Sequence, residues 1–260
     1  MIYYQELLTL ENIFIIIAYV CTTPMIAWIF NDLFWCKNKT NTNDKLVEKS
    51  DHQQTIRTNV DTLFKHMSQD QVKAVSRKLT EDYSVAVINL NGDLNTGNIM
   101  RTACCCGCDT FYVLGKRHYD SRSDVGSRRY LNVSKDSSIV TSPNDKRVSL
   151  TIDVTLFSQW IEKNNIMPIF IEQGGESLAT VGWNQVTNQT NGRQICFIFG
   201  NETWGIPRNV LGLSKTIPGS RILSIPQHNV MKSHNVSISA GIVLWDYYRS
   251  AILKPMYDKL

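Results

Sequence analysis

Two common nucleotide-binding motifs are absent from this sequence of 260 residues. It contains no GxxxxGK(S/T) loop, which holds phosphates in P-loop NTPases, and no GxGxxG turn after the first predicted strand, which binds dinucleotides in Rossmann enzymes. Neither class of enzyme is supported. A secretory cleavage signal is also missing, and the seven cysteines are an odd number, with four crowded into residues 104–108. A reduced intracellular compartment, the cytoplasm, is therefore expected.

The cysteine cluster lacks the partners that a metal site needs. No second Cys/His pair lies at ligand spacing, and His118 is isolated from the cluster. Structural zinc requires four converging ligands. The sequence therefore predicts no metal, and the plain alternative for the cluster is a helix of small, buried thiols.

Lys and Arg are missing from residues 1–36, which argues against a mitochondrial transit peptide. Residues 12–31 hold no charge and are about as long as the ~20 residues of a membrane-spanning helix. Lys37 and Lys39 follow directly, so an anchor here would leave the rest of the chain in the cytosol. The alternative is an apolar helix packed on the body or on a partner subunit. Because the chain's formal charge is +4 and residues 1–36 contribute −3, the remainder carries +7, which suits a polyanionic partner.

Four segments are predicted along the chain. Residues 1–36 form an apolar segment, 37–51 a polar linker, 52–82 a helical extension with apolar residues at three- and four-residue steps, and 83–260 a catalytic domain. Within the last segment, short apolar runs at 84–90, 110–114, 167–171 and 194–199 predict strands, and 153–163 and 236–253 predict helices. This alternation predicts an α/β fold with a mostly parallel sheet.

Two short stretches carry side chains suited to chemistry. Glu202 lies between glycines just after a predicted buried strand, where α/β proteins gather ligands. Ser233 and Asn235 precede the last predicted helix, where backbone amides are free. Taken alone, a tight turn and a helix cap would explain both stretches equally well.

Three sequence blocks together resemble the signature motifs of the SpoU/TrmH-type (SPOUT) RNA ribose 2′-O-methyltransferases. The family patterns are N-x-G-N-(I/L)-x-R-T, F-G-x-E-x-x-G-(I/V)-P and I-P-x-x-G-x-x-x-S-L-N-V-S. The matching residues here are Asn95, Gly97, Asn98 and Arg101, then Phe199, Gly200, Glu202, Gly205 and Pro207, then Ile225, Pro226, Ser233, Asn235 and Ser237. The resemblance covers about residues 83–253. Two positions depart from it: Asn229 replaces a glycine, and His234 replaces a leucine.

The resemblance implies a C-terminal trefoil knot, a homodimer and methyl transfer from S-adenosylmethionine to a ribose 2′-hydroxyl of RNA, without a metal. It places cofactor contacts, largely through backbone groups, at Glu172, Gly200, Ile225 and His234. It gives Arg101 the task of activating the hydroxyl, as a base or as a group that orients it and stabilises the developing alkoxide. Asn95, Glu202, Ser233 and Asn235 would complete the catalytic set, and transfer RNA is favoured over ribosomal RNA as the substrate.

A basic loop at residues 116–130 is the strongest predicted RNA contact outside these motifs. Basic side chains bind phosphates, and aromatic side chains stack on unpaired bases. The predicted contacts are Arg117, Arg122, Arg128 and Arg129 in the loop and, by resemblance, Arg249. A solvated loop, and for Arg249 an ordinary surface position, are the alternatives.

Two rival functions remain open from the sequence. One is a knotted RNA-binding scaffold without turnover, possible because His234 is unusual and the N-terminus is atypical. The other is a related knotted enzyme that methylates a base nitrogen, which the complete ribose-type motif set disfavours.

Overall fold

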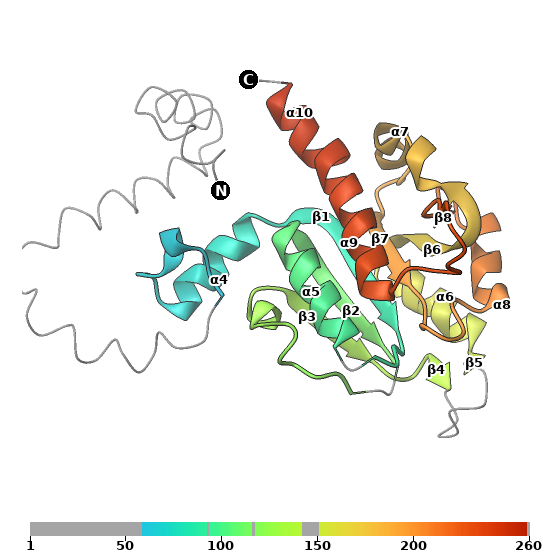
Figure 1. Ribbon diagram of the computed structural model, residues 1–260, viewed down its shortest axis with the longest axis horizontal. Helices are drawn as coiled ribbons and strands as arrows, with labels where there is room; N and C mark the ends of the chain where they lie inside the picture. The colour runs from blue at the N-terminus through green and yellow to red at the C-terminus, as the bar shows by residue number, and fades with distance from the viewer. Residues whose placement is uncertain (1–58, 93, 116–117, 142–150, 259–260) are drawn as a thin grey trace, which may run out of the picture. The chain divides into compact units, whose positions relative to one another are not determined.

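The computed structural model describes residues 59–92, 94–115, 118–141 and 151–258 (Figure 1). All of them belong to one compact unit, Arg57–Leu260. The predicted apolar segment 1–36, the linker 37–51 and Arg117 lie outside the described residues. None of the helices in the described ranges is long and apolar enough to cross a membrane.

The described part begins with a short 3-10 helix, Thr62–Phe64, and helix α4, Gln69–Lys78. A capping box starts α4: the Gln71 N–H donates to Ser68 Oγ (3.3 Å), and the Ser68 N–H donates to Gln71 Oε1 (2.8 Å). The predicted helical extension to residue 82 is too long, because strand β1 already begins at Glu81. The first two residues of β1, Glu81 and Asp82, are exposed, and Glu81 pairs with Cys108 of the neighbouring strand. A search for apolar runs does not detect such residues.

Six strands form one parallel sheet, in the order β3-β2-β1-β7-β6-β8. The strands are β1 (Glu81–Ile88), β2 (Cys108–Leu114), β3 (Asn132–Asp136), β6 (Ile166–Ser177), β7 (Gln194–Phe199) and β8 (Arg221–Ser224). A separate antiparallel pair joins β4 (Val140–Thr141) to β5 (Thr151–Ile152). The α/β fold with a mostly parallel sheet is confirmed. The edge strands β3 and β8 were not predicted, because β3 is polar and β8 has only four residues.

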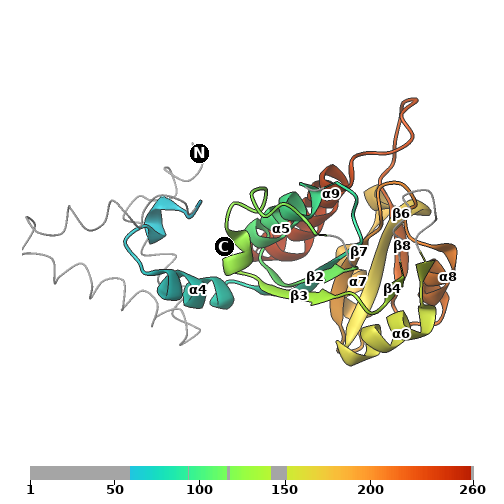
Figure 2. The same ribbon diagram turned by 90° about the horizontal axis from the view of Figure 1, so that it is seen from below.

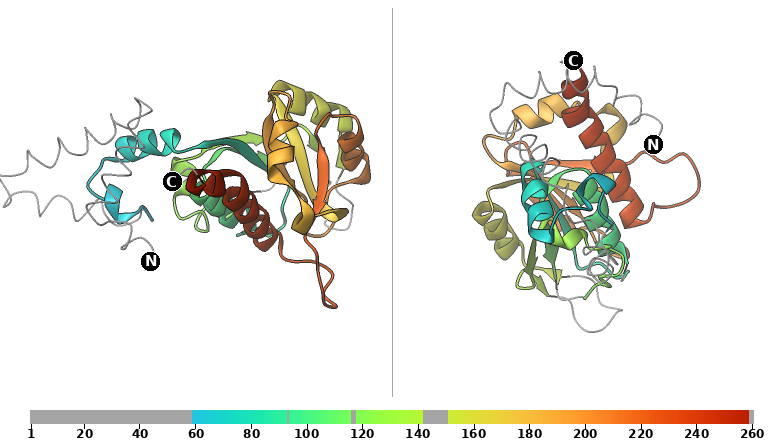
Figure 3. Two further views of the ribbon diagram at one scale, coloured as in Figure 1. Left: turned by 90° about the horizontal axis from the view of Figure 1, so that it is seen from above. Right: turned by 90° about the vertical axis from the view of Figure 1, so that its left-hand side faces the viewer.

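Helices cover both faces of the sheet (Figures 2 and 3). Along β1, Val85 and Val87 pack into one core with α5 (Asn95–Cys105), α7 (Trp183–Asn188) and α9 (Val236–Tyr247), while Ala86 and Ile88 pack into a second core with α6 (Val154–Lys163) and α8 (Arg208–Leu211). Alternate residues of a strand point to opposite faces, so a strand covered on both sides is apolar throughout. This explains why the central strands read as continuous apolar runs.

The predicted C-terminal helix 236–253 has a more complex form. Residues 236–253 form α9 and a π-helical segment, Tyr248–Leu253, and α10, Lys254–Tyr257, continues beyond the predicted end. Pro255, which has no N–H to donate, lies at the start of α10. The first turn of α9 lies at the same end of the molecule as the start of α5, and the two helices pack against each other.

The cysteine cluster ends α5 and begins β2. Cys106 and Cys108 are buried, Cys104 is half-buried and Cys105 is exposed, so the expectation of a helix of buried thiols is only partly correct. Burial raises the pKa of the Cys104 and Cys106 thiols to about 11, which keeps both protonated at neutral pH. No group of three or more metal-ligating side chains occurs within the described ranges.

The strand order reverses its direction of growth between β1 and β7, the two central strands. Ligands of open α/β sheets bind outside the carboxyl ends of the strands at such a switch point. In this chain the residues following β1 and those following β7 meet there, and they include Asn95 of the first sequence block and Glu202 of the second.

Candidate active site

The Glu202 carboxylate is the hub of hydrogen bonds at the switch point. It follows β7 and accepts from three donors that follow β1: the Asn91 N–H (2.6 Å), the Gly92 N–H (2.9 Å) and the Asn95 side-chain amide (2.8 Å). A carboxylate that satisfies free amides beside a helix start is favourably placed. Glu202 therefore ties the first sequence block to the second.

Asn95 extends this chain of hydrogen bonds to the third block. Its Oδ1 accepts from the Asn235 Nδ2 (3.3 Å), and Asn235 in turn caps α9 by accepting from the Ser237 N–H (2.8 Å). The capping interpretation of Asn235 is thus correct, and the same side chain also reaches Asn95. Residues 95, 202 and 235, far apart in sequence, form one polar cluster.

The pKa of Glu202 reflects this environment. Burial raises the pKa, but the hydrogen bonds from Asn91, Asn95 and Gly92 outweigh it and lower the pKa below its usual value near 4.5. A carboxyl whose pKa is lowered by folding contributes stability above the unfolded value, and this stability is lost as pH falls through the folded pKa.

Thermal unfolding should show this dependence. Wild-type protein is expected to exceed Glu202→Gln in unfolding midpoint at pH 7, because the amide presents an N–H group toward N–H donors. The difference should shrink as pH falls below about 4.5, where the carboxyl is protonated first in the unfolded chain and, at a lower pH, in the folded protein. A difference that stays constant down to about pH 3 would contradict this account of the cluster.

A cavity of about 660 Å³ opens beside the cluster. Its walls come from the middle of β6, the turn after β7 and the segment between β8 and α9. The residues predicted to contact the cofactor all line it, namely Glu172, Gly200, Ile225 and His234, and so do Glu202, Ser233 and Asn235. The structure thus gathers seven of the predicted site residues around one cavity.

Close backbone packing shapes the cavity wall at Gly200. A Cβ atom there would lie 2.5 Å from the Gly205 carbonyl carbon and 2.7 Å from the Ile206 nitrogen. Glu172 holds the same turn, because its Oε2 accepts from the Ile206 N–H at 2.8 Å. Glu172 therefore lines the cavity and also fixes the turn that forms part of its wall.

Arg101 lies outside the cavity. It is exposed on α5 with Leu94, Asn98 and Cys105, which share one face of the helix at three- and four-residue spacing. Its side chain forms no hydrogen bond or ion pair with any residue in the described ranges. The guanidinium is therefore available to a substrate, but the single chain does not bring it to the cluster.

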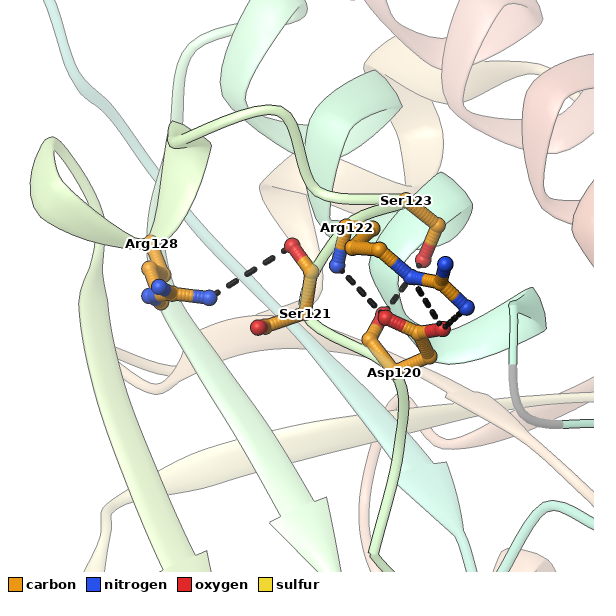
Figure 4. A network of polar contacts seen from close by, with 5 residues as sticks. All are labelled: Asp120, Ser121, Arg122, Ser123 and Arg128. Atoms are coloured by element: carbon orange, nitrogen blue, oxygen red, sulfur yellow. Dashed lines mark hydrogen bonds and ion pairs between the residues drawn. The ribbon is translucent and has the colours of Figure 1, made fainter. Parts of the chain in front are cut away.

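The basic loop is held together by its own acidic residues, and Figure 4 shows the pairing of Arg122 with one of them, Asp120. Arg122 folds back onto Asp120, with Nε at 2.8 Å from Oδ2, and this pairing lowers the pKa of the Asp120 carboxyl. Arg128 pairs at 2.8 Å with Asp124, whose carboxylate is fully buried and also accepts from the Gly126 N–H. Arg129 is exposed without an ion pair to the described residues. Two of the predicted RNA contacts in the loop thus also have ion-pair partners, and the Arg129 side chain has none among the described residues.

The loop packs directly on the first block. A Cβ at Gly97 of α5 would collide with Ser123 Oγ and would lie 2.7 Å from the Asp124 nitrogen. Glycine at this motif position therefore lets the basic loop approach the helix that carries Asn95 and Arg101. Arg249, the remaining predicted contact, pairs at 3.0 Å with Asp246, which also accepts from the Trp183 indole.

Sequence reasoning missed Asn91, Gly92 and Asn201. The Asn91 side chain donates to Thr203 Oγ1 (2.9 Å), and the buried Asn201 donates to the Asn89 carbonyl (2.7 Å), so both join the end of β1 to the turn after β7. The Asn-Gly pair at 91–92, directly after an apolar run, is a turn signal that could have drawn attention to this position.

Comparisons with known proteins agree with this geometry. The model of the SpoU rRNA Methylase family matches residues 82–245. The chain belongs to this family. Residues of all three blocks fall within the match, including the whole Glu202, Asn95 and Asn235 cluster.

Solved structures show the same fold at low sequence identity. The TrmH/SpoU tRNA modifying enzyme of A. aeolicus is 17% identical with a TM-score of 0.53, over 73% of this chain and 85% of that one. The SpoU methyltransferase AviRb from Streptomyces viridochromogenes, in complex with the cofactor AdoMet, is 21% identical with a TM-score of 0.50, over 68% of this chain and 64% of that one. A search of curated proteins finds no match.

Proposed function

We propose that this protein transfers a methyl group from S-adenosylmethionine to a ribose 2′-hydroxyl of RNA, with transfer RNA as the first substrate to test. The observation that carries the proposal is the hydrogen-bonded cluster of Glu202, Asn95 and Asn235, which joins the three family motifs beside the cavity. Membership in the SpoU family supports the reaction class. The tRNA modifying enzyme among the structures of the same fold agrees with the choice of RNA.

The cavity suits S-adenosylmethionine in size and chemistry. Its volume of about 660 Å³ is in the range of small-molecule sites, and its wall includes the closely packed backbone at Gly200. Lys232 adds positive charge at the cavity for a carboxylate. The bound cofactor supplies an electrophilic methyl group on a sulfonium. His234 and Asn229 replace the usual family residues, and neither replacement removes a side chain of the cluster.

The protein's own residues would align the hydroxyl. A ribose hydroxyl is a weak nucleophile, so orientation and proton removal must accompany attack. Asn95, Ser233 and Asn235 would position the ribose, with Glu202 fixing Asn95. Arg101 is a cation without a partner in the described ranges, on the same helix as Asn95. Because a guanidinium holds its proton strongly, we assign it to orienting the hydroxyl and stabilising the developing alkoxide. The hydroxyl proton then passes to solvent or to a substrate phosphate.

We further propose a homodimer through the outer face of α9. Ile238 and Trp245, one heptad apart, are 56% and 54% exposed, and Leu94 at the start of the neighbouring α5 is 51% exposed. Exposed apolar side chains on one surface mark an interaction site. A two-fold interface here would bring the outward face of α5, with Arg101, close to a second chain. Sedimentation of the full chain tests this assembly.

The trefoil knot is also a proposal. The segment between β8 and α9 lines the cavity opposite the turn after β7, as a C-terminal segment passing through a preceding loop would do. Chains generally avoid knots, so the family relationship is the main support for it.

The decisive experiment follows methyl transfer from labelled S-adenosylmethionine by the full chain to transfer RNA and to ribosomal RNA, with nucleoside analysis of the product. A 2′-O-methylated nucleoside from tRNA supports the whole proposal, and one from rRNA changes only the substrate. A methylated base would contradict ribose methylation and indicate an enzyme that methylates the base. Cofactor binding without transfer to any RNA would favour the non-catalytic RNA-binding scaffold.

A further inference from the structure

Trp204 is a large aromatic side chain that the proposed chemistry does not use. It is 45% exposed and lines the cavity between the carboxyl ends of the central strands. Its indole N–H has no hydrogen-bond partner within the described ranges, whereas the indole of Trp183 donates to Asp246 at 2.8 Å. Ligand sites are lined largely by apolar and aromatic side chains, so an exposed indole on a cavity wall offers its face to a ligand.

The backbone that carries Trp204 is firmly held. The Asn201 Oδ1 accepts from the N–H groups of Thr203 (2.9 Å) and Trp204 (3.2 Å). Asn201 and Gly205 exchange two backbone hydrogen bonds that close the turn, at 3.2 and 2.8 Å. Gly205 has a φ of +66°, a conformation that favours glycine. The indole therefore stands on a preorganised turn, which lowers the entropy cost of binding a ligand against it.

The surroundings of Trp204 match the chemistry of a nucleotide. Two residues earlier in the same turn, the Glu202 carboxylate is held by hydrogen bonds from Asn91, Gly92 and Asn95 and keeps its negative charge, so an anionic ligand at the indole needs a cation nearby. Four residues later, Arg208 also lines the cavity, is exposed and has no ion pair to a described residue. An aromatic face for a base, with a cation nearby for a phosphate, is the combination used to bind unpaired RNA nucleotides.

We propose that Trp204 is the stacking platform for the base of the methylated nucleotide, with Arg208 binding an adjacent phosphate. This inference rests on the proposed function, because it names the substrate contact of the same site. A base stacked on the indole would leave its ribose toward the Asn95 and Asn235 cluster, which borders the same cavity. Stacking accepts any base face, so Trp204 contributes affinity and orientation rather than base identity.

The kinetic test compares Trp204→Ala, Trp204→Phe and the full-length wild type. Trp204→Ala should raise the KM for RNA by about 5- to 150-fold, from the usual contribution of one stacked base. Its Kd for S-adenosylhomocysteine should stay within about twofold of wild type. Trp204→Phe, which keeps a smaller ring, should lie between them. Leu156→Ala, an exposed apolar residue on α6 away from the cavity, is the control for general surface effects.

A second readout does not depend on turnover. With saturating S-adenosylhomocysteine present, RNA should quench tryptophan fluorescence in the wild type and much less in Trp204→Phe. This titration separates the two proposals. If RNA quenches the fluorescence of Trp204 but the wild type transfers no methyl group, RNA stacking on Trp204 is supported and the proposed methyltransferase activity is contradicted. If the variants transfer methyl groups with the same KM for RNA and the same quenching as the wild type, the stacking role of Trp204 is contradicted and the methyltransferase activity is supported. A weakened cofactor Kd alone would instead assign Trp204 to the cofactor and overturn the platform.

Discussion

Alanine in place of Arg101 is expected to lower the rate of methyl transfer by about 10²- to 10⁴-fold, the usual range for a side chain that assists proton transfer or stabilises developing charge. The thermal unfolding midpoint should hardly change. The Arg101 side chain is exposed on α5 and makes no hydrogen bond or ion pair to the described residues, and substitutions at such positions usually alter stability by less than about 0.5 kcal/mol. Single-turnover transfer to RNA, measured beside thermal unfolding, checks both expectations.

Two further variants sharpen the test at Arg101. Arg101→Lys keeps the charge but loses the planar fork of donors, so a large loss in this variant indicates orientation of the hydroxyl rather than charge alone. Arg193→Ala is the matched control: Arg193 lies just before β7, at the opposite end of the strand from the site, and pairs with Glu162 at 3.0 Å. Activity that survives Arg101→Ala within about tenfold would remove Arg101 from the mechanism.

Gly200→Ala is expected to abolish measurable cofactor binding at micromolar concentrations and to destabilise the fold by about 1–3 kcal/mol, the usual cost of overpacking. The added Cβ would meet the backbone of Gly205 and Ile206 at 2.5 and 2.7 Å, and backbone atoms cannot rotate away as a side chain can. To relieve the contact, the turn after β7 must shift. That shift would move the wall of the cavity and the Ile206 N–H that donates to Glu172. Calorimetric titration with S-adenosylhomocysteine measures the loss.

Gly212→Ala provides the control for this glycine. Gly212 follows α8 with a φ of −57°, and a Cβ there would meet no atom within 4 Å, so alanine should fit without strain. Equal cofactor affinity in the two variants would show that the tight approach at Gly200 does not shape the cofactor site. Loss in Gly200→Ala alone supports the proposed placement of the cofactor.

The central strands were readable from the sequence because they are covered on both faces. The runs at 84–90, 110–114, 167–171 and 194–199 are apolar at nearly every position, and each lies within or overlaps an observed strand. Strand β3 was not predicted because most of its side chains are polar and none is fully buried at the sheet edge. Helix α5 was not recognised from periodicity: its first turn is glycine- and asparagine-rich, and tertiary packing of Ile99, Met100 and Ala103 supports it.

The candidate site was only partly readable. The motif residues pointed to Asn95, Glu202 and Asn235. Their hydrogen bonds, however, form because β1 and β7, which are far apart in sequence, are neighbours in the sheet. The same pairing brings in Asn91, Gly92 and Asn201, which no motif marks. In the other direction, Arg122 and Arg128 look free in sequence, whereas the loop conformation pairs them with Asp120 and Asp124.

The sequence by itself determined the family motifs, the α/β class and the direction of the central strands, because these follow from local patterns of apolar and polar residues. Only the tertiary structure decided which polar groups meet. Parallel pairing of β1 with β7 places the turn at 91–92 against Glu202, and packing of α5 on α9 places Asn95 against Asn235. Hydrogen bonds require partners within about 3 Å, and that proximity is set by long-range packing, which the order of residues along the chain does not display.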